Sequence, residues 1–122
     1  MGFKLYGYQF GPAKRYIKAT KNYFSDNGII TALNIKISEG QLIENFVISE
    51  FEKRRKLLAF DCDQLFYYKS AGGAEIDLII ESDGYVNAIE IKNSTKPSNK
   101  DIRTLKNFVS EDPQKRRGFL LY

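Results

Sequence analysis

The chain contains no histidine, and this absence excludes the most chemistry. Serine–histidine and cysteine–histidine nucleophiles are not available to it. The single cysteine, Cys62, cannot form an internal disulfide, and a zinc site would need more cysteine or histidine than the chain contains. We therefore expect a reduced, intracellular protein located in the cytoplasm.

Long hydrophobic runs are also absent. No stretch approaches the ~20 apolar residues of a transmembrane helix, and the N-terminus lacks the apolar region of a signal peptide. No membrane partner is therefore expected. Three prolines and nine glycines argue against a disordered chain. With 43% apolar residues, the 122 residues suffice for one domain with its own core.

Basic residues are clustered although the net charge is only +4. Residues 1–24 carry lysine and arginine but no acid, and further basic clusters occupy residues 53–56 and 115–117. Such clusters suit a polyanion such as nucleic acid. For residues 53–56 we prefer a second explanation, because cations stabilise the C-terminal end of a helix.

The N-terminal segment is rich in aromatic residues that could stack on bases. Aromatic side chains dominate small cores, however, so we expect most of them to be buried. Residues 1–37 are therefore expected to pack as a basic, aromatic segment on a core formed by residues 38–122, within a single domain. The aromatic residues concerned are Tyr6, Tyr8, Phe10, Tyr16, Tyr23 and Phe24.

A long helix is predicted over residues 39–57, because Ser38 and Gln41 have the spacing of a capping box. At 100° per residue its apolar side chains form one stripe, which we expect to face the core. Two acids interrupt the stripe, Glu44 at its border and Glu50 near its middle, and the pattern does not distinguish their roles. The stripe comprises Leu42, Ile43, Phe46, Val47, Phe51, Leu57 and Leu58, with Asn45, Ser49, Glu52 and Lys53 on the far side.

The remaining elements predict an α/β fold. A short strand at 21–24 and a short helix at 29–34 precede the long helix. Strand-like residues 65–70 follow it and lead into a β-hairpin. A second helix begins after Ser98 and ends before Pro113, and a last strand covers 118–122. The core order is αβββαβ, a mixed central sheet flanked by helices, in which the last strand returns parallel.

The hairpin organises the chain. Asp83-Gly84 lies between two apolar-rich runs and is a strong signal for a two-residue turn. In the register that this turn sets, Asp77 faces Glu90 directly across the two strands. Because side chains alternate along strands, one face carries Glu75, Asp77, Glu90 and Lys92, and the opposite, core-facing side carries Ile76, Leu78, Ile80, Ile89 and Ile91.

Two carboxylates directly opposite each other destabilise a sheet unless a positive charge offsets them. Lys92, two residues from Glu90 on the same face, is one candidate for that charge. A divalent cation is the other, since Mg²⁺ is typically held by one or two carboxylates together with water and phosphate. An ordinary solvated sheet face with cross-strand ion pairs explains the pattern equally well.

The motifs Asp77 and Glu90-Ile91-Lys92, with Glu44 on the preceding helix, resemble the PD-(D/E)XK nuclease superfamily, which has the restriction-endonuclease-like fold. Over about residues 20–110 the chain is similar to the uncharacterised nuclease-like C-terminal domain of prokaryotic AAA-type ATPases. The segments that carry this resemblance are Asn22–Gly28, Glu44–Val47, Ser49-Glu50, Tyr67–Ser70, Glu75–Asp77 and Ile89–Lys92.

The resemblance implies a metal-dependent nuclease acting on DNA, resolvase-like activity on branched DNA being one version. Asp77, Glu90 and the Ile91 carbonyl would ligate Mg²⁺ or Mn²⁺, with Glu44 completing the shell through water. Lys92 would orient or help to deprotonate the attacking water. An AAA-type ATPase would be a partner, and resolvase-like relatives suggest a homodimer.

The chain also departs from the pattern. Ile76 replaces the first proline of the motif, and relatives of this type continue past the last strand, which indicates a shortened domain. The chain has no G-x-x-x-x-G-K-[ST] motif, so it does not contain the ATPase itself. Two alternatives therefore stay open: a non-catalytic module that binds nucleic acid or protein for an ATPase, and a remnant whose acids simply form ion pairs.

Overall fold

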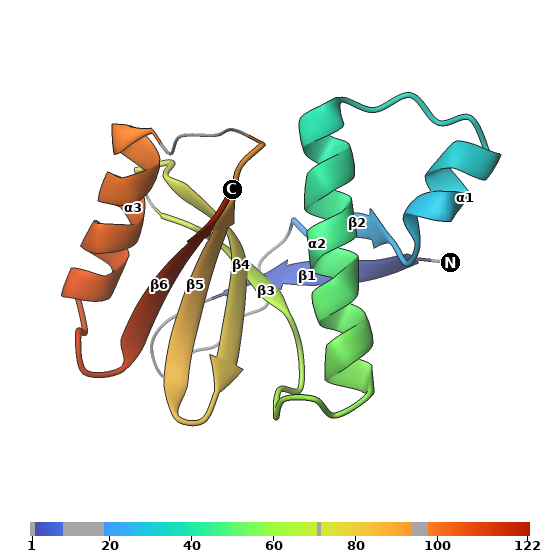
Figure 1. Ribbon diagram of the computed structural model, residues 1–122. Coiled ribbons are helices and arrows are strands. Elements are labelled where there is room, and N and C mark those ends of the chain that lie inside the picture. Colours follow the sequence, from blue (N-terminus) through green and yellow to red (C-terminus); the bar gives the residue numbers. More distant parts are fainter. Residues whose placement is uncertain (1, 9–18, 71, 94–97) are drawn as a thin grey trace.

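The computed structural model describes residues 2–8, 19–70, 72–93 and 98–122. It shows a mixed α/β fold in which helices flank one six-stranded sheet of order β2-β1-β3-β4-β5-β6 (Figure 1). No helix in these ranges is long and apolar enough to span a membrane. The strands are β1 (Gly2–Gly7), β2 (Lys21–Phe24), β3 (Phe66–Lys69), β4 (Glu75–Ser82), β5 (Tyr85–Ile91) and β6 (Arg116–Leu121), and the helices are α1 (Asn27–Ala32), α2 (Glu39–Lys56) and α3 (Asn99–Ser110).

The sheet is mixed because some neighbouring strands pair antiparallel and others pair parallel. The consecutive strands β3, β4 and β5 pair antiparallel, and α3 then carries the chain across so that β6 lies parallel to β5. Strand β1 was not predicted; it pairs antiparallel with β2 and parallel with β3. In Figure 1, α2 (green) lies beside β1 and β2, whereas α3 (orange) lies beside β6. The predicted order αβββαβ is therefore confirmed from α2 onward.

The hairpin turn and its register are confirmed. Asp83 and Gly84 both have positive φ, at 56° and 78°, as a type I′ turn requires. The ladder then runs in the predicted register from Ser82↔Tyr85, but its last pair is Leu78↔Ile89. The predicted backbone pairing of Asp77 with Glu90 lies just beyond that end.

A β-bulge in β4 interrupts the alternation of faces at Asp77. Phe66 pairs with Ile79 and Tyr68 with Ile76, so the two residues Asp77 and Leu78 lie opposite the single residue Tyr67. Ile76 and Ile79 consequently belong to one apolar cluster, whereas Leu78, Ile80, Ile89 and Ile91 belong to the other. The prediction that Ile76 shares a face with Leu78 was therefore wrong.

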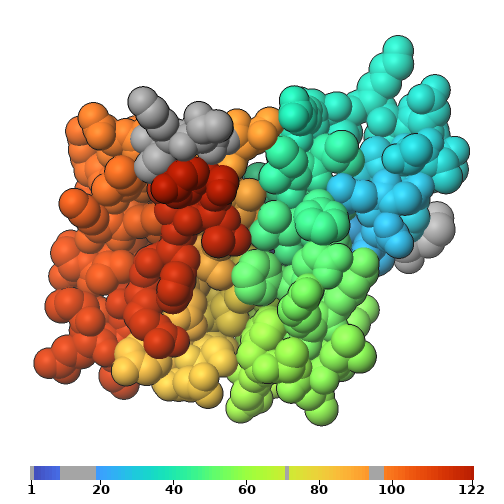
Figure 2. All heavy atoms as spheres, viewed as in Figure 1, coloured from blue at the N-terminus to red at the C-terminus, as the bar shows by residue number. Residues whose placement is uncertain are grey.

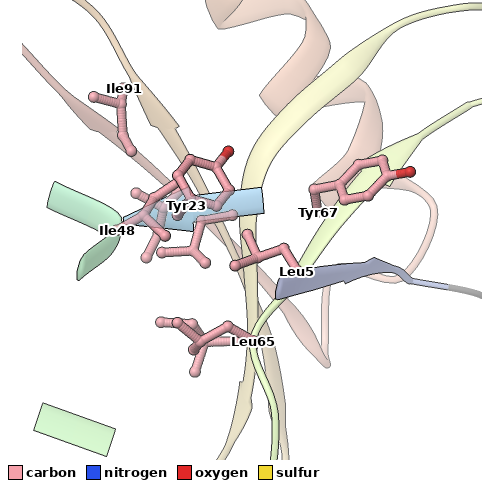
Figure 3. Close-up of a cluster of buried hydrophobic side chains, with 9 residues drawn as sticks. Leu5, Tyr23, Ile48, Leu65, Tyr67 and Ile91 are labelled. Atoms are coloured by element: carbon pink, nitrogen blue, oxygen red, sulfur yellow. The ribbon is translucent and has the colours of Figure 1, made fainter. Parts of the chain in front are cut away.

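Both faces of the sheet are covered by apolar clusters. The first, seen in Figure 3, includes Ile48 of α2, and the second includes Leu105 and Phe108 of α3. Tyr8 and Tyr23 are buried, as predicted, and Tyr6 and Phe24 are half-buried. The other aromatic residues of the predicted set, Phe10 and Tyr16, lie outside the described residues.

Helix α2 begins at the predicted capping box, but the side that it buries was predicted only in part. Ile43, Val47 and Phe51 of the predicted stripe pack against the core, as expected. Its buried residues are Asn45, Ile48, Ser49 and Glu52, whereas Phe46 is 52% exposed and Leu57 and Leu58 are 80% and 85% exposed. The polar side chains are tolerated inside because each has a hydrogen-bond partner. Asn45 bonds Phe24 and Asn27, Ser49 donates to the Phe46 carbonyl, and Glu52 accepts from Arg55.

Asn45 joins three elements, and we expect Asn45→Ala to lower the free energy of unfolding by about 3 kcal/mol. Its side chain accepts from the N–H of Phe24 and donates to the Phe24 carbonyl and to Asn27 Oδ1, at 2.8 to 3.1 Å. The substitution leaves these groups without that partner in a half-buried position. Urea denaturation measures the loss. Asn107→Ala, on the exposed side of α3, should change stability by less than about 0.5 kcal/mol.

Candidate functional site

Asp77 lies where strands β4 and β5 stop pairing. Its Oδ2 accepts a hydrogen bond from the backbone N–H of Ile91 at 2.9 Å. The ladder has already ended at Leu78↔Ile89, so a side chain bonds a β5 amide that faces β4. Bulges re-aim side chains in this way and are common next to active sites. The bulge thus places the Asp77 carboxylate between the two strands, beside Glu90.

The buried Glu90 pairs with the half-buried Asp77. Glu90 is only 5% exposed. Burial raises the pKa of Glu90 to about 9, and the neighbouring Asp77, which accepts a hydrogen bond from the protonated Glu90 carboxyl, adds to the effect. At neutral pH the protonated form of the Glu90 carboxyl is therefore favoured. This confirms the predicted proximity of the two acids, but Glu90 is buried and does not lie on a solvated face.

Glu44 approaches the pair from α2. Tyr23, buried in β2, donates its hydroxyl to Glu44 Oε2 at 2.7 Å. Burial raises the pKa of Glu44; Asp77 adds to this effect, whereas the Tyr23 hydrogen bond and Lys21 oppose it. The two acids of the α2 stripe are thereby distinguished. Glu50 pairs instead with Arg54 at 2.6 Å, which lowers the Glu50 pKa.

Lys92 lies at the same end of β5. Its Nζ is 3.2 Å from Asp101 Oδ1 in the first turn of α3, and Asp101 in turn accepts a hydrogen bond from Ser98 Oγ at 2.6 Å. Burial opposes the Lys92 charge, but Asp101, Glu90 and Asp77 outweigh it and raise the Lys92 pKa. Lys92 therefore lies in the field of the carboxyl pair. Its side chain stays 40% exposed.

Sequence reasoning missed two residues of this site and misplaced a third. Tyr23 and Asp101 make the closest side-chain contacts to Glu44 and Lys92, yet they lie on elements whose docking no local pattern encodes. Asp101 did have a signal as a first-turn acid after Ser98, but only for helix capping. Glu75, predicted to face Lys92, instead forms an ion pair with Lys21 at 3.7 Å.

The ligand set suits a hard divalent cation only in part. Among the described residues, no three histidine, cysteine, aspartate or glutamate side chains lie close enough to hold one ion. Asp77 and Glu90 provide two adjacent carboxyls, and the Ile91 carbonyl faces β4 on the same side as the N–H that Asp77 binds. Two carboxylates, one carbonyl and water form a set that Mg²⁺ or Mn²⁺ accepts. Glu44 fits only as a more distant ligand acting through water.

The fold and the site together define an α/β domain with two adjacent acids, of which Glu90 is buried, at the end of a hairpin where the strands stop pairing. Residues 39–122 match the family model described as Domain of unknown function (DUF4143), and the chain belongs to this family. The matched region contains Glu44, Asp77, Glu90 and Lys92 but not Tyr23. No curated protein and no solved structure was found to match the chain.

Proposed function

We propose that this protein is a metal-dependent nuclease of the restriction-endonuclease-like class that hydrolyses phosphodiester bonds in DNA. The observation that carries the proposal is the pairing of the buried Glu90 with the half-buried Asp77 beside the bulge, with Lys92 two residues after Glu90, just past the end of β5. Burying the Glu90 carboxyl against a second carboxyl costs stability, which a structural role does not require. A bound cation would offset this cost, and this explains why the two carboxyls lie together.

Each residue of the site would have its own role in the reaction. Asp77, Glu90 and the Ile91 carbonyl would hold Mg²⁺ or Mn²⁺, and Glu44, fixed by Tyr23, would contact its water shell. Such an ion lowers the pKa of water and neutralises phosphate charge. The Lys92 ammonium would orient the attacking water and stabilise negative charge developing on the phosphate. None of these roles needs histidine.

The fold class, the DNA substrate, the ATPase partner and the cellular location belong to the same proposal. The order αβββαβ and the mixed sheet support the restriction-endonuclease-like assignment, and the basic clusters suit DNA. Branched DNA as substrate, an AAA-type ATPase as partner and a cytoplasmic location follow from the resemblance of the motifs.

One observation favours the alternative of a non-catalytic binding module. The amine of Lys92 is already engaged by Asp101, which is itself anchored to Ser98. If this ion pair persists when DNA and metal are present, Lys92 does not reach a substrate. The domain would then bind nucleic acid or a partner protein without cleaving, and its DNA affinity would fall steeply with salt.

The deciding experiment pairs DNA cleavage with metal-induced thermal stabilisation. We expect Mg²⁺ or Mn²⁺ to raise the melting temperature and to support cleavage of plasmid or branched DNA, and we expect Asp77→Asn to lose both effects. Asparagine still accepts the Ile91 N–H, so the fold should survive. Glu50→Gln, which changes the acid of α2 that faces away from the pair, is the matched control and should retain both.

The two readouts separate the possible outcomes. Metal stabilisation without cleavage would support the non-catalytic module and reject the nuclease. If neither cleavage nor metal stabilisation is seen, the acids form only a structural cluster.

A further inference from the structure

Strand β2 brings a lysine to the acids of the proposed site. Lys21 and Tyr23 are two residues apart on β2, so their side chains share one face of the sheet. The Tyr23 hydroxyl binds Glu44 of α2 at 2.7 Å, and the Nζ atom of Lys21 lies 3.7 Å from Glu75 Oε2. Glu75 in turn is two residues before Asp77 on β4. Lys21 is therefore a close neighbour of the site, and the proposed function gives it no role.

The Lys21 ammonium is held in place but keeps hydrogen-bond donors. Its Nζ lies 4.8 Å from the centroid of the Tyr67 ring, a cation–π distance, and the Tyr67 hydroxyl is fixed by a 2.5 Å hydrogen bond to the Ala19 carbonyl. Among the described residues, Glu75 is its only ion-pair partner, and their 3.7 Å separation is longer than a hydrogen bond. An ammonium has three N–H donors. Lys21, whose side chain is 31% exposed, can therefore bind a ligand without leaving its position.

Lys21 and Lys92 approach the acids from different sides. Lys92 contacts Asp101 of α3, whereas Lys21 lies on the face of the sheet that α2 covers. Figure 2 shows the blue segment that includes β2 against the green α2, on the side of α2 away from the orange α3. Asp77 raises the pKa of both Glu44 and Lys92, so it is near each of them. The centre of the proposed site therefore has one lysine toward α3 and another toward α2.

We propose that Lys21 binds a backbone phosphate of the DNA strand that lies across the site, next to the phosphate that is cleaved; this inference rests on the proposed function. A DNA strand carries a negative phosphate at every nucleotide, so a strand whose scissile phosphate lies at Asp77 and Glu90 presents further phosphates on both sides. Charge-assisted hydrogen bonds from lysine to phosphate are strong, and such contacts position a strand without reading its sequence. Lys92 acts on the scissile phosphate and Lys21 on its neighbour.

An ion pair with Glu75 explains Lys21 less well. The two side chains are 31% and 46% exposed, and ion pairs at that exposure contribute little to stability. Glu75 also lies directly across from Lys69 on β3, so it already has another cation beside it. The acids of the site repel phosphate, and Lys21 supplies a positive charge on the side of the site that faces α2. A phosphate contact therefore accounts for both the position and the charge of this lysine.

The test measures binding of a fluorescein-labelled DNA duplex at several salt concentrations, with Ca²⁺ in place of Mg²⁺ so that binding is measured apart from cleavage. We expect Lys21→Met to reduce the slope of log K against log salt by about 0.9, the value of one phosphate contact, and the affinity by about five- to tenfold at about 0.1 M salt. Lys21→Arg keeps the charge and should keep the wild-type slope. Lys4→Met is the control, because Lys4 is an exposed lysine of the neighbouring strand β1 on the other face of the sheet.

A wild-type slope in Lys21→Met would overturn the phosphate contact. So would a slope for Lys21→Arg as low as that of Lys21→Met, because a change that follows the shape of the side chain and not its charge is structural. Melting temperatures of the three variants should match wild type, which excludes loss of the fold as the cause. DNA binding with a normal Lys21→Met slope rejects this contact alone, whereas DNA binding without cleavage in Mg²⁺ rejects the nuclease and leaves the contact to be decided by the slope. A chain that binds no DNA rejects both.

Discussion

Replacing Lys92 with methionine is expected to lower metal-dependent DNA cleavage by about 10²- to 10⁴-fold while metal still stabilises the fold. Methionine keeps the apolar stem of the side chain and removes only the ammonium. The carboxyl pair that would hold the ion, Asp77 and Glu90, is left in place. Because the Lys92 side chain is 40% exposed and its ion pair with Asp101 lies near the surface, little stability should be lost.

The measurement is the cleavage rate at saturating metal, alongside the metal-induced rise in melting temperature. Lys100→Met, an exposed lysine in the first turn of α3, is the matched control and should cleave at the wild-type rate. If Lys92→Met loses the metal response as well as cleavage, the ammonium acts in holding the site together and not in the chemical step. If cleavage is unchanged, Lys92 has no role in it.

Local signals in the sequence were sufficient to predict most of the helices and strands and the register of one strand pair. The capping box of Ser38 and Gln41 marks the first residue of α2, and Asp83-Gly84 sets the β4–β5 pairing. Both involve residues within a few positions of each other, so the chain encodes them without reference to the rest of the fold. The proximity of Asp77 and Glu90 followed from the same turn.

The parts that could not be predicted depend on docking between distant elements. The bulge at Asp77 arises in the pairing with β3, which the hairpin alone does not contain. Helix α2 also buries Asn45, because this side chain finds partners on β2 and α1, whereas a rule based on apolar periodicity assigns it to solvent. The contact of Tyr23 with Glu44 has the same origin.

The polar residues that α2 buries also change the explanation for the position of Glu44. Glu44 was explained as an acid at the border of a core-facing stripe, and it lies between Ile43, which packs against the core, and the buried Asn45. In this half-buried position, Glu44 accepts a hydrogen bond from Tyr23. The carboxylate can face Asp77 because Tyr23 supports it from β2.

The carboxyl pair should make the metal-free protein less stable as the pH rises. Burial and Asp77 raise the Glu90 pKa from 4.5 to about 9 in the folded state. Between these values the folded chain keeps a proton that the unfolded chain releases, so the contribution is fully present below 4.5 and is lost as the pH rises through about 9. One such group lowers the free energy of unfolding by about 1.4 kcal/mol per pH unit within that window.

Glu90→Gln should remove this dependence, because glutamine donates a hydrogen bond to Asp77 at every pH. We expect urea midpoints measured without metal at pH 5.5, 7 and 8.5 to fall for wild type and to stay nearly level for Glu90→Gln, so that the variant is the more stable protein at pH 8.5. Glu111→Gln, whose acid is 61% exposed, is the control and should follow wild type. Parallel wild-type and Glu90→Gln profiles would show that Glu90 is charged in the folded state. In that case a positive group, and not a shared proton, must neutralise the pair.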